Sequence, residues 1–392
     1  MNYIIFEDKN SKSLSPISDL HATFELRIGS FTNIERILFQ ASNDDSIQLY
    51  VRNEIEDIIR EKYPDIAVNP EFFNPGIYIN GASICYFDDF KNFDRSRSYS
   101  NSKGLVAFTH DENIDKEKID GLIDSQSTIS SRLSVDSIEY LWDSFDILAD
   151  TIKKDYSLLY DYKSGSLHPS CILIKEDNII INNNAKVSAG SVLDASNGPI
   201  IIDEDVNLDI GTLIKGPAYI GKGSVLNPGA KIIGPVSIGP FCKVGGEIED
   251  SIIQGFSNKQ HDGFLGHSYV GEWVNLGANT NTSDLKNNYS NVRVKLNEDS
   301  QLDTGKMFIG SIIGDFSSTA ISTKLNTGTH IGVGSNIFSH IFEKKYIPPF
   351  SWGNNDKVGL NRFIEKCQAI MIRRDKELSE ALKNRLITLW KK

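Results

Sequence analysis

Residues 202–244 read IDEDVNLDIGTLIKGPAYIGKGSVLNPGAKIIGPVSIGPFCKV, and this stretch decides the fold. Every sixth residue in it is aliphatic: Ile202, Leu208, Ile214, Ile220, Leu226, Ile232, Ile238 and Val244. A period of six is too short for a helical repeat and is typical of a β-helix built from hexapeptides. We expect three hexapeptides to form one triangular coil, with the aliphatic side chains inside and the coils stacked about 4.8 Å apart. The sequence therefore predicts a left-handed parallel β-helix.

The repeat extends in both directions from this stretch. Upstream, Ile181, Val187 and Leu193 keep the period, and downstream Val270 and Leu276 share one register. A further register contains Ile313, Thr319, Leu325, Ile331 and Ile337. We therefore predict a β-helix over residues 170–340, interrupted at 249–269 and 283–308. Loops are the usual carriers of function on such a scaffold, so these two interruptions are the first places to look for a site.

The N-terminal residues, 1–165, read as an α/β domain. Tyr3 to Phe6 predicts a buried strand that ends in Glu7 and Asp8, and Thr32-Asn33-Ile34-Glu35 is a capping box that opens a helix. Alternating strands and helices predict a largely parallel sheet whose ligands sit at the carboxyl ends of the strands. Leu141, Phe145, Leu148 and Ile152 share one face of a helix that ends this domain. Residues 341–392 predict an extended exit followed by two helices.

Composition excludes several classes of function. The chain has 41 basic and 52 acidic residues, a net charge of −11, which argues against nucleic acid or an anionic membrane as a partner. No apolar run reaches the 18 or so residues of a membrane span, and the N-terminus has no secretory signal. The four cysteines are scattered without metal-ligand spacing. We therefore expect a cytoplasmic protein with reduced thiols.

The second half of the chain carries a local motif. His261-Asp262-Gly263-Phe264-Leu265-Gly266 is followed by Val274-Asn275-Leu276-Gly277-Ala278-Asn279-Thr280 and then by Asn288-Tyr289. This arrangement resembles the bifunctional enzymes that make UDP-N-acetylglucosamine, which join N-acetylglucosamine-1-phosphate uridyltransferase to glucosamine-1-phosphate N-acetyltransferase. The family's segments have the form His-x-x-Tyr-x-Gly, Val-Asn-Ile-Gly-Ala-Gly-Thr and Asn-Tyr. The spacing from the histidine to the Asn-Leu-Gly-Ala run is preserved.

Nearly the full chain also resembles a group described as sugar nucleotidyltransferases. The shared segments here are Phe6-Glu7-Asp8, Leu26-Arg27-Ile28-Gly29, Ile79-Asn80-Gly81, Trp142-Asp143 and Ser257 to Gly266. The resemblance implies a nucleotidyltransferase-like domain in front of an acyltransferase-like β-helix. It also implies a nucleoside triphosphate, a sugar phosphate and acetyl-CoA as substrates, Mg²⁺ for nucleotidyl transfer, and a homotrimer.

Acetyl transfer to an amine needs a base for the amine's proton and donors for the carbonyl oxygen. Histidine suits the base role because its pKa lies near working pH. We take His261 as this base, with His267 either its partner or a corner residue. By the resemblance, Asn275 binds the sugar and the backbone of Ala278 faces the thioester.

The remaining implied roles lie in both halves of the chain. Asn288 and Tyr289 lie near the acetyl group, and Phe264 stands where the family has a tyrosine. In the N-terminal domain, the resemblance implies that Asp8 is the metal ligand and that Asp8 and Arg27 bind the nucleotide.

Two departures from the family leave alternatives open. The Gly-rich loop of nucleotidyltransferases is missing, since Phe6 is followed by Glu7-Asp8-Lys9-Asn10, and Glu249-Asp250 stands where a sugar-phosphate lysine is expected. One alternative keeps a single activity, with the other half degenerate or purely structural. Another makes the β-helix a trimerisation or regulatory scaffold, with Asp8 in a solvated turn and Arg27 at a surface helix cap.

Overall fold

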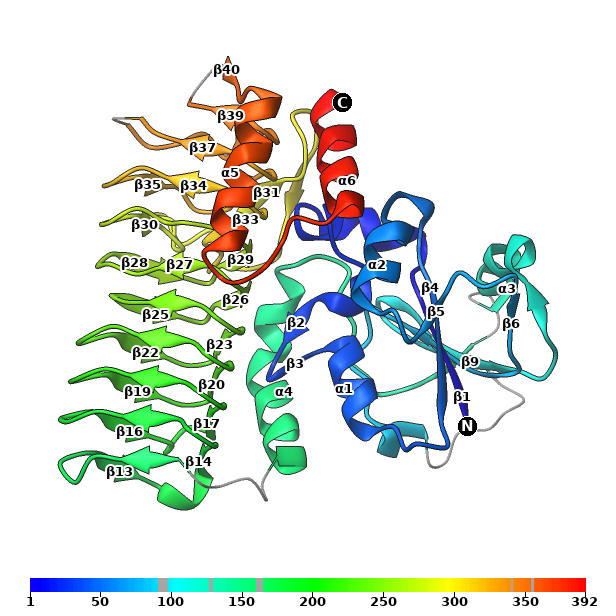
Figure 1. The fold of residues 1–392 in the computed structure, drawn as a ribbon, viewed down its shortest axis with the longest axis horizontal. Coiled ribbons are helices and arrows are strands. Elements are labelled where there is room, and N and C mark those ends of the chain that lie inside the picture. Colours follow the sequence, from blue (N-terminus) through cyan, green and yellow to red (C-terminus); the bar gives the residue numbers. More distant parts are fainter. Residues whose placement is uncertain (91–97, 127–129, 160–164, 340, 354–355) are drawn as a thin grey trace.

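The computed structural model describes residues 1–90, 98–126, 130–159, 165–339, 341–353 and 356–392. An N-terminal α/β domain lies beside a tall β-helix, with the helix α4 between them and two C-terminal helices at the upper end (Figure 1). The β-helix predicted from the six-residue period is confirmed.

The N-terminal domain is built on a seven-stranded mixed sheet of order β11-β8-β9-β7-β1-β4-β5. The strands β1, β4, β5 and β7 run parallel, while β9 is antiparallel to both β7 and β8. In sheet order the strands span Ser130–Arg132, Ser98–Asn101, Gly104–His110, Gly76–Asn80, Asn2–Phe6, Ser46–Tyr50 and Ala67–Val68. Two small pairs, β2 (Arg27–Ile28) with β3 (Phe31–Thr32) and β6 (Phe72–Phe73) with β10 (Ile114–Asp115), complete its strands.

The helices of this domain follow the expected signals. Thr32 caps α1 (Asn33–Gln40) through its side chain, and Glu35 reaches back to complete the capping box. The apolar face expected at residues 141–152 is the buried face of α4 (Asp143–Leu159). The remaining α-helices are α2 (Glu56–Lys62) and α3 (Ile119–Gln126), with short 3-10 turns at Lys9–Leu14, Ile17–Asp19, Thr23–Glu25, Asn53–Ile55, Phe87–Phe90 and Lys116–Lys118.

The β-helix has three faces of stacked parallel strands. The first face contains β12 (Ser166–Leu167), β15 (Lys186–Val187), β18 (Asn207–Leu208), β21 (Val225–Leu226), β24 (Lys243–Val244) and β27 (Asn258–Lys259). The second face contains β13 (Ile172–Ile174), β16 (Val192–Asp194), β19 (Leu213–Lys215), β22 (Lys231–Ile233), β25 (Glu247–Glu249) and β28 (Phe264–Gly266). The aliphatic residues of the repeat meet in one buried core inside the prism.

The third face is a nine-stranded sheet that packs on the N-terminal domain. It contains β14 (Ile179–Ile181), β17 (Ile200–Ile202), β20 (Ala218–Ile220), β23 (Val236–Ile238), β26 (Ile252–Gly255), β29 (Tyr269–Glu272), β33 (Ser311–Ile313), β36 (Thr329–Ile331) and β38 (Tyr346–Ile347). Ile201, Tyr219 and Tyr269 of this face share a buried cluster with Leu148 and Ile152 of α4. The N-terminal domain therefore covers one of the three faces.

The upper coils and the C-terminal segment close the prism. The upper strands are β30 (Asn281–Thr282), β34 (Ser318–Thr319), β35 (Lys324–Leu325), β37 (Asn336–Ile337), β39 (Ser351–Trp352) and β40 (Asp356–Lys357). The helices α5 (Leu360–Ile372) and α6 (Glu380–Lys391) follow. Phe363 of α5 packs edge-on against Phe316 and Phe350, which stand at one corner of the prism. The two helices predicted at the C-terminus are confirmed.

One predicted interruption of the β-helix is wrong. Residues 249–269 stay in the coil, because β26, β27, β28 and β29 each pair in parallel with the strand one coil earlier. The inward positions here are Ile248, Ile253, Lys259, Leu265 and Val270. The step from Val244 to Ile248 is four residues and two later steps are five, in place of six, and one inward residue is a lysine. The period is therefore lost in the sequence although the coil continues.

The second predicted interruption, 283–308, does leave the coil. It carries β31 (Arg293–Lys295) and β32 (Gln301–Asp303), which pair antiparallel as a hairpin. Val292 and Val294 join the buried cluster of α4, and the Lys306 ammonium pairs with Asp146 of that helix. The excursion therefore contributes to the contact between the two halves of the molecule.

Candidate active sites

The first candidate site is the carboxyl edge of the N-terminal sheet. Asp8 follows β1, and its carboxylate accepts hydrogen bonds from the Asn10 N–H at 2.9 Å and from Asn80 Nδ2 at 3.0 Å. Asn80 is the last residue of the neighbouring strand β7. The cavity at this edge, which Lys103 and Glu139 also line, measures only about 10 Å³. The edge thus holds the expected polar residues, but they bond to one another in a nearly closed space.

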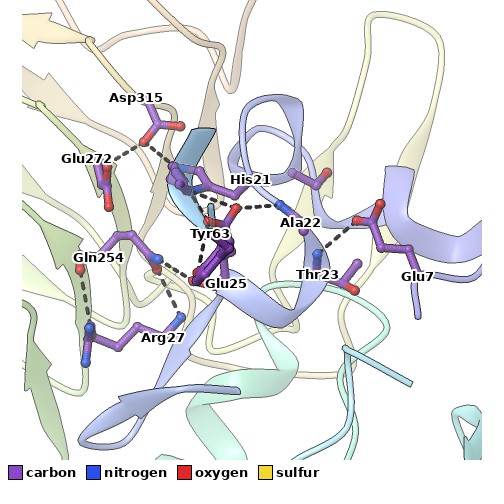
Figure 2. Close-up of polar contacts among 12 residues, drawn as sticks. Glu7, His21, Ala22, Thr23, Glu25, Arg27, Tyr63, Gln254, Glu272 and Asp315 are labelled. Carbon is purple, nitrogen blue, oxygen red and sulfur yellow. Dashed lines mark hydrogen bonds and ion pairs between the residues drawn. The ribbon is translucent and has the colours of Figure 1, made fainter. Parts of the chain in front are cut away.

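The neighbouring carboxylate, Glu7, is buried and tied to the protein. It accepts from the Thr23 N–H at 2.9 Å, as Figure 2 shows, and from the Arg52 N–H at 3.0 Å. The Arg52 guanidinium also pairs with it. Burial raises the pKa of Glu7, and Arg52 opposes this shift. The contacts of Glu7 therefore join the end of β1 to two neighbouring segments.

Arg27 lies at the boundary between the N-terminal domain and the β-helix and is buried. Its guanidinium donates to the carbonyl oxygens of Gln254 at 3.2 Å and Ser30 at 2.8 Å, and pairs with Glu35 at 3.1 Å. Figure 2 shows the Arg27 side chain pointing toward Gln254 of the β-helix. These contacts engage every nitrogen of the guanidinium, and none of them involves Asp8.

Next to Arg27 lies a buried polar cluster that the sequence did not point to. His21 Nε2 lies 3.3 Å from Asp315 Oδ1 of the β-helix, and His21 Nδ1 lies 3.8 Å from Glu25 (Figure 2). Burial lowers the pKa of His21, but Asp315 and other carboxylates outweigh this, so that its pKa is raised overall. The partners His21 and Asp315 are 294 positions apart in the chain, so no local pattern could have revealed their contact.

The second candidate site is one corner of the prism, between its first and second faces. We call it the His261 corner: the turn of residues 260–263 and the turn of residues 277–280 directly above it. The Asn279 N–H donates to the Asp262 carbonyl at 2.8 Å, which fixes one turn on the other. His261 is exposed, and Ala278 is half-buried. Among the described residues, no acceptor lies within hydrogen-bonding distance of the Ala278 N–H.

Two further predicted residues lie on this part of the prism. Asn275 is exposed, and its Oδ1 lies 3.3 Å from Asn258 Nδ2 in the coil below. Asn258 in turn accepts from the Arg374 guanidinium at 2.8 Å. Phe264 is half-buried, and its N–H donates to Asn281 at 2.9 Å. The corner therefore brings His261, Phe264, Asn275 and Ala278 onto consecutive coils.

Asn288 and Tyr289 lie elsewhere, in the excursion 283–308. Both are exposed, Tyr289 by 65%. The Asn288 side chain accepts hydrogen bonds from Ser290, two residues along. Within the described part of the chain, none of the contacts of this pair reaches the His261 corner.

His267 has a different environment from His261. Its Nδ1 lies 2.8 Å from Asp284, the second residue of the excursion, and its ring stacks on Phe308, the last. Its Nε2 lies 3.7 Å from Asp250. Carboxylates thus face both ring nitrogens of His267, whereas no carboxylate of the described residues forms an ion pair with His261.

Neither a metal-ligand cluster nor a membrane-spanning helix is found among the described residues, and one further cavity is present. In the residues that the structure describes, no three His, Cys, Asp or Glu side chains gather as metal ligands, and no helix has the length and apolarity to cross a membrane. A cavity of about 1090 Å³ opens between Arg52, Tyr346 and Arg385. It contains none of the predicted site residues.

Comparison with known proteins gives a family match for the N-terminal domain. Residues 3–163 match the model of the sugar nucleotidyl transferase family. The N-terminal domain is thus similar to this family. A bifunctional sugar-1-phosphate nucleotidylyltransferase/acetyltransferase of Sulfurisphaera tokodaii is 31% identical over 170 residues, covering 41% of this chain and 40% of that protein. The bifunctional protein GlmU of Thermotoga maritima is 25% identical over 249 residues, covering 62% and 45%.

The chain spans less than half the length of these curated relatives. Among solved structures, the UDP-N-acetylglucosamine acyltransferase of Francisella novicida matches 57% of this chain and 78% of its own, at 15% identity and a TM-score of 0.35. The corresponding acyltransferase of Campylobacter jejuni matches 57% and 90%, at 14% identity and a TM-score of 0.22. In this chain, a domain that matches the sugar nucleotidyl transferase model precedes a β-helix built from hexapeptides.

Proposed function

We propose that this protein is an enzyme of nucleotide-sugar biosynthesis whose β-helix transfers an acetyl group from acetyl-CoA to the amine of an amino-sugar phosphate. The observation that carries the proposal is the His261 corner. It places an exposed imidazole and a backbone N–H without a protein acceptor, that of Ala278, on consecutive coils of one prism edge. Acyl transfer needs this pair of groups, a base and an oxyanion donor.

The reaction needs both groups. The neutral amine of the sugar attacks the thioester carbonyl carbon, and His261 takes the amine proton as the C–N bond forms. The Ala278 N–H stabilises the oxyanion. The oxyanion then collapses, the C–S bond breaks, and the protonated His261 gives its proton to the sulfur, so that the coenzyme leaves as a thiol.

The other residues have binding roles. Asn275 bonds to the sugar, and Phe264 lines its ring. Asn288 and Tyr289, on the excursion, contact the acetyl end of the donor only if the excursion rearranges toward the His261 corner.

We further propose that the active assembly is a homotrimer. Exposed apolar side chains stand along the same prism edge, below and above the His261 corner: Ile210, Ile321 and Ile341 are 57%, 76% and 70% exposed. Exposed apolar side chains that recur along one edge favour contact with another protein surface. A second copy of the chain would cover these side chains and enclose His261. Light scattering tests this: three chains of 43.7 kDa support it, and a monomer contradicts it.

Nucleotidyl transfer in the front domain is the second activity that we propose. It rests on the family match of residues 3–163 and on Asp8, at the end of β1. Mg²⁺ in nucleotide sites is held by one or two carboxylates together with substrate phosphates. Asp8 fits such a one-carboxylate site through its Oδ1, which accepts one hydrogen bond, from the Asn10 N–H, and keeps a second lone pair, whereas Oδ2 accepts from both Asn80 and the Asn10 side chain. The substrates would be a nucleoside triphosphate and a sugar phosphate, with Arg27 a nucleotide-binding residue only if its contacts rearrange.

Thiol release from acetyl-CoA with a panel of amino-sugar phosphates tests the main proposal. Release that falls about a hundredfold or more in His261→Ala supports His261 as the base. His168→Ala, which alters another exposed histidine at the lower end of the β-helix, is the matched control. Absence of release with every acceptor contradicts acetyl transfer. It favours the alternative, a β-helix that serves as a trimerisation or regulatory scaffold for a cytoplasmic nucleotidyltransferase.

A further inference from the structure

A lysine occupies a position inside the prism that the repeat reserves for aliphatic side chains. On the first face, Lys259 follows a register of Val187, Leu208, Leu226 and Val244. Those four side chains belong to the apolar core, and Lys259 is only 3% exposed. Burial of an ammonium group is costly unless its hydrogen bonds are supplied by the protein. A specific role must therefore offset the cost at this position.

The Lys259 ammonium finds its partners at the His261 corner. It donates to the His261 carbonyl at 2.6 Å and to the Gly245 carbonyl, one coil below, at 2.9 Å. Gly246 makes room for it, since a Cβ there would stand 2.8 Å from Nζ. The ammonium thus holds the backbone of His261 from inside the prism.

The other carbonyls of the same turn are held by neutral donors. The Gln260 carbonyl accepts from the Asn227 side chain at 2.8 Å. The Asp262 and Gly263 carbonyls accept from backbone N–H groups of the coils above and below, at 2.8 and 3.2 Å. Among these four carbonyls, only that of His261 has a charged donor. Loss of this one bond would leave the peptide of His261 free to rotate while its neighbours stay fixed.

We propose that Lys259 is a positioning residue for His261, which fixes the direction of the imidazole by holding the His261 carbonyl inside the prism. This inference rests on the proposed role of His261 as the base. Burial lowers the pKa of Lys259 to about 8, against an opposing effect of the Asp262 carboxylate. Deprotonation weakens the bond to the carbonyl, because charge-assisted hydrogen bonds are roughly twice as strong as neutral ones. The His261 turn therefore loosens as the pH rises through about 8.

The test uses histidine signals in NMR and does not depend on activity. With ¹³C-labelled histidine, the His261 signal is assigned by comparison with His261→Gln. Wild type should show an inflection near pH 8, which reports the titration of Lys259. Lys259→Met should lack it, since methionine fills the same space without a titrating group. Leu226→Met, in the same register two coils below, is the matched control and should keep the inflection.

Kinetics supply a second readout. We expect kcat of Lys259→Met to fall at least tenfold, with KM for acetyl-CoA changed less than threefold and with no loss of rate between pH 7.5 and 9. An inflection that persists in Lys259→Met overturns the proposal. If that variant does not fold, a wild-type His261 signal without an inflection near pH 8 overturns it equally. If wild type releases no thiol, acetyl transfer fails, and the NMR comparison still decides whether Lys259 holds His261.

Discussion

The carboxyl edge of the N-terminal sheet and the His261 corner of the β-helix differ in how far their polar groups are already bonded. At the sheet edge, Asp8 bonds to Asn80 and Asn10 beside a cavity of only about 10 Å³. At the corner, His261 is exposed, and the Ala278 N–H has no acceptor among the described residues. Groups that already bond to one another must rearrange before they bind a substrate, whereas unbonded groups need not. The difference favours the corner as the site that is ready for chemistry.

Asp8→Asn gives the largest expected effect at the sheet edge. The substitution keeps the shape but removes the charge that would hold Mg²⁺. We expect Mg²⁺-dependent pyrophosphate release from a nucleoside triphosphate and a sugar phosphate to fall on the order of a hundredfold or more. Thiol release from acetyl-CoA by the same preparation should not change. Equal pyrophosphate release in wild type and Asp8→Asn would contradict the role of Asp8.

Arg27→Met separates a structural role from a nucleotide-binding role. The change leaves the carbonyls of Gln254 and Ser30 without their donor at the boundary between the domains. We expect the free energy of unfolding, measured with urea, to fall by about 2–4 kcal/mol. Arg293→Met, at an exposed ion pair, should cost less than about 1 kcal/mol. Unchanged stability with a raised KM for the nucleotide would instead place Arg27 in the nucleotide site.

The buried His330 allows a test of how burial of a histidine affects the pH dependence of stability. It lies on β36, where its Nε2 is 3.2 Å from the Ser15 carbonyl of the N-terminal domain, and burial lowers its pKa to about 4. The unfolded chain, with a histidine pKa near 6.5, binds the proton first, so acid favours unfolding. We expect up to about 3 kcal/mol of unfolding free energy to be lost between pH 6.5 and pH 4.

His330→Gln, which cannot titrate, should remove this part of the pH dependence. Urea unfolding at pH 7 and pH 5 measures it for both proteins. Identical pH dependence in wild type and His330→Gln would contradict the assignment. His261→Gln, at an exposed position, should leave the pH dependence of stability as it is in wild type.

Phe264→Tyr gives the smallest expected effect. The family that this chain resembles has a tyrosine at this position. The substitution restores that hydroxyl directly after the turn of residues 260–263. We expect KM for the amino-sugar phosphate to fall by about threefold to tenfold, about 1 kcal/mol, the value of one hydrogen bond. Steady-state kinetics at fixed acetyl-CoA measure the change. A KM that rises would place the ring away from the sugar.

The sequence predicted the parts of the fold that depend on local periodicity. The run from Ile202 to Val244 specified the β-helix because every sixth side chain there is aliphatic and lies in the core of the prism. The capping box at Thr32 specified α1 for an equally local reason. Where steps shortened to four or five and Lys259 took an inward position, the same rule failed. The six-residue period therefore predicted an interruption at 249–269 that the structure does not have.

The candidate sites depend more on contacts between distant residues. The motif located His261 and Asn275, but the repeat did not place His261 on a coil, because His261 lies in the predicted interruption at 249–269. By contrast, the engagement of Arg27 with Gln254 and of His21 with Asp315 joins residues more than 200 positions apart. The bond from Lys259 to the His261 carbonyl depends on which way a side chain turns inside the prism. Neither kind of contact has a signature in a single sequence.

Parallel assays of thiol release and pyrophosphate release, on wild type, His261→Ala and Asp8→Asn, test the central claim most directly. We predict that His261→Ala loses thiol release about a hundredfold or more and keeps pyrophosphate release, while Asp8→Asn does the reverse. Thiol release that survives in His261→Ala, or that is absent from wild type with every amino-sugar phosphate, would contradict the assignment of acyl transfer to the corner of the β-helix.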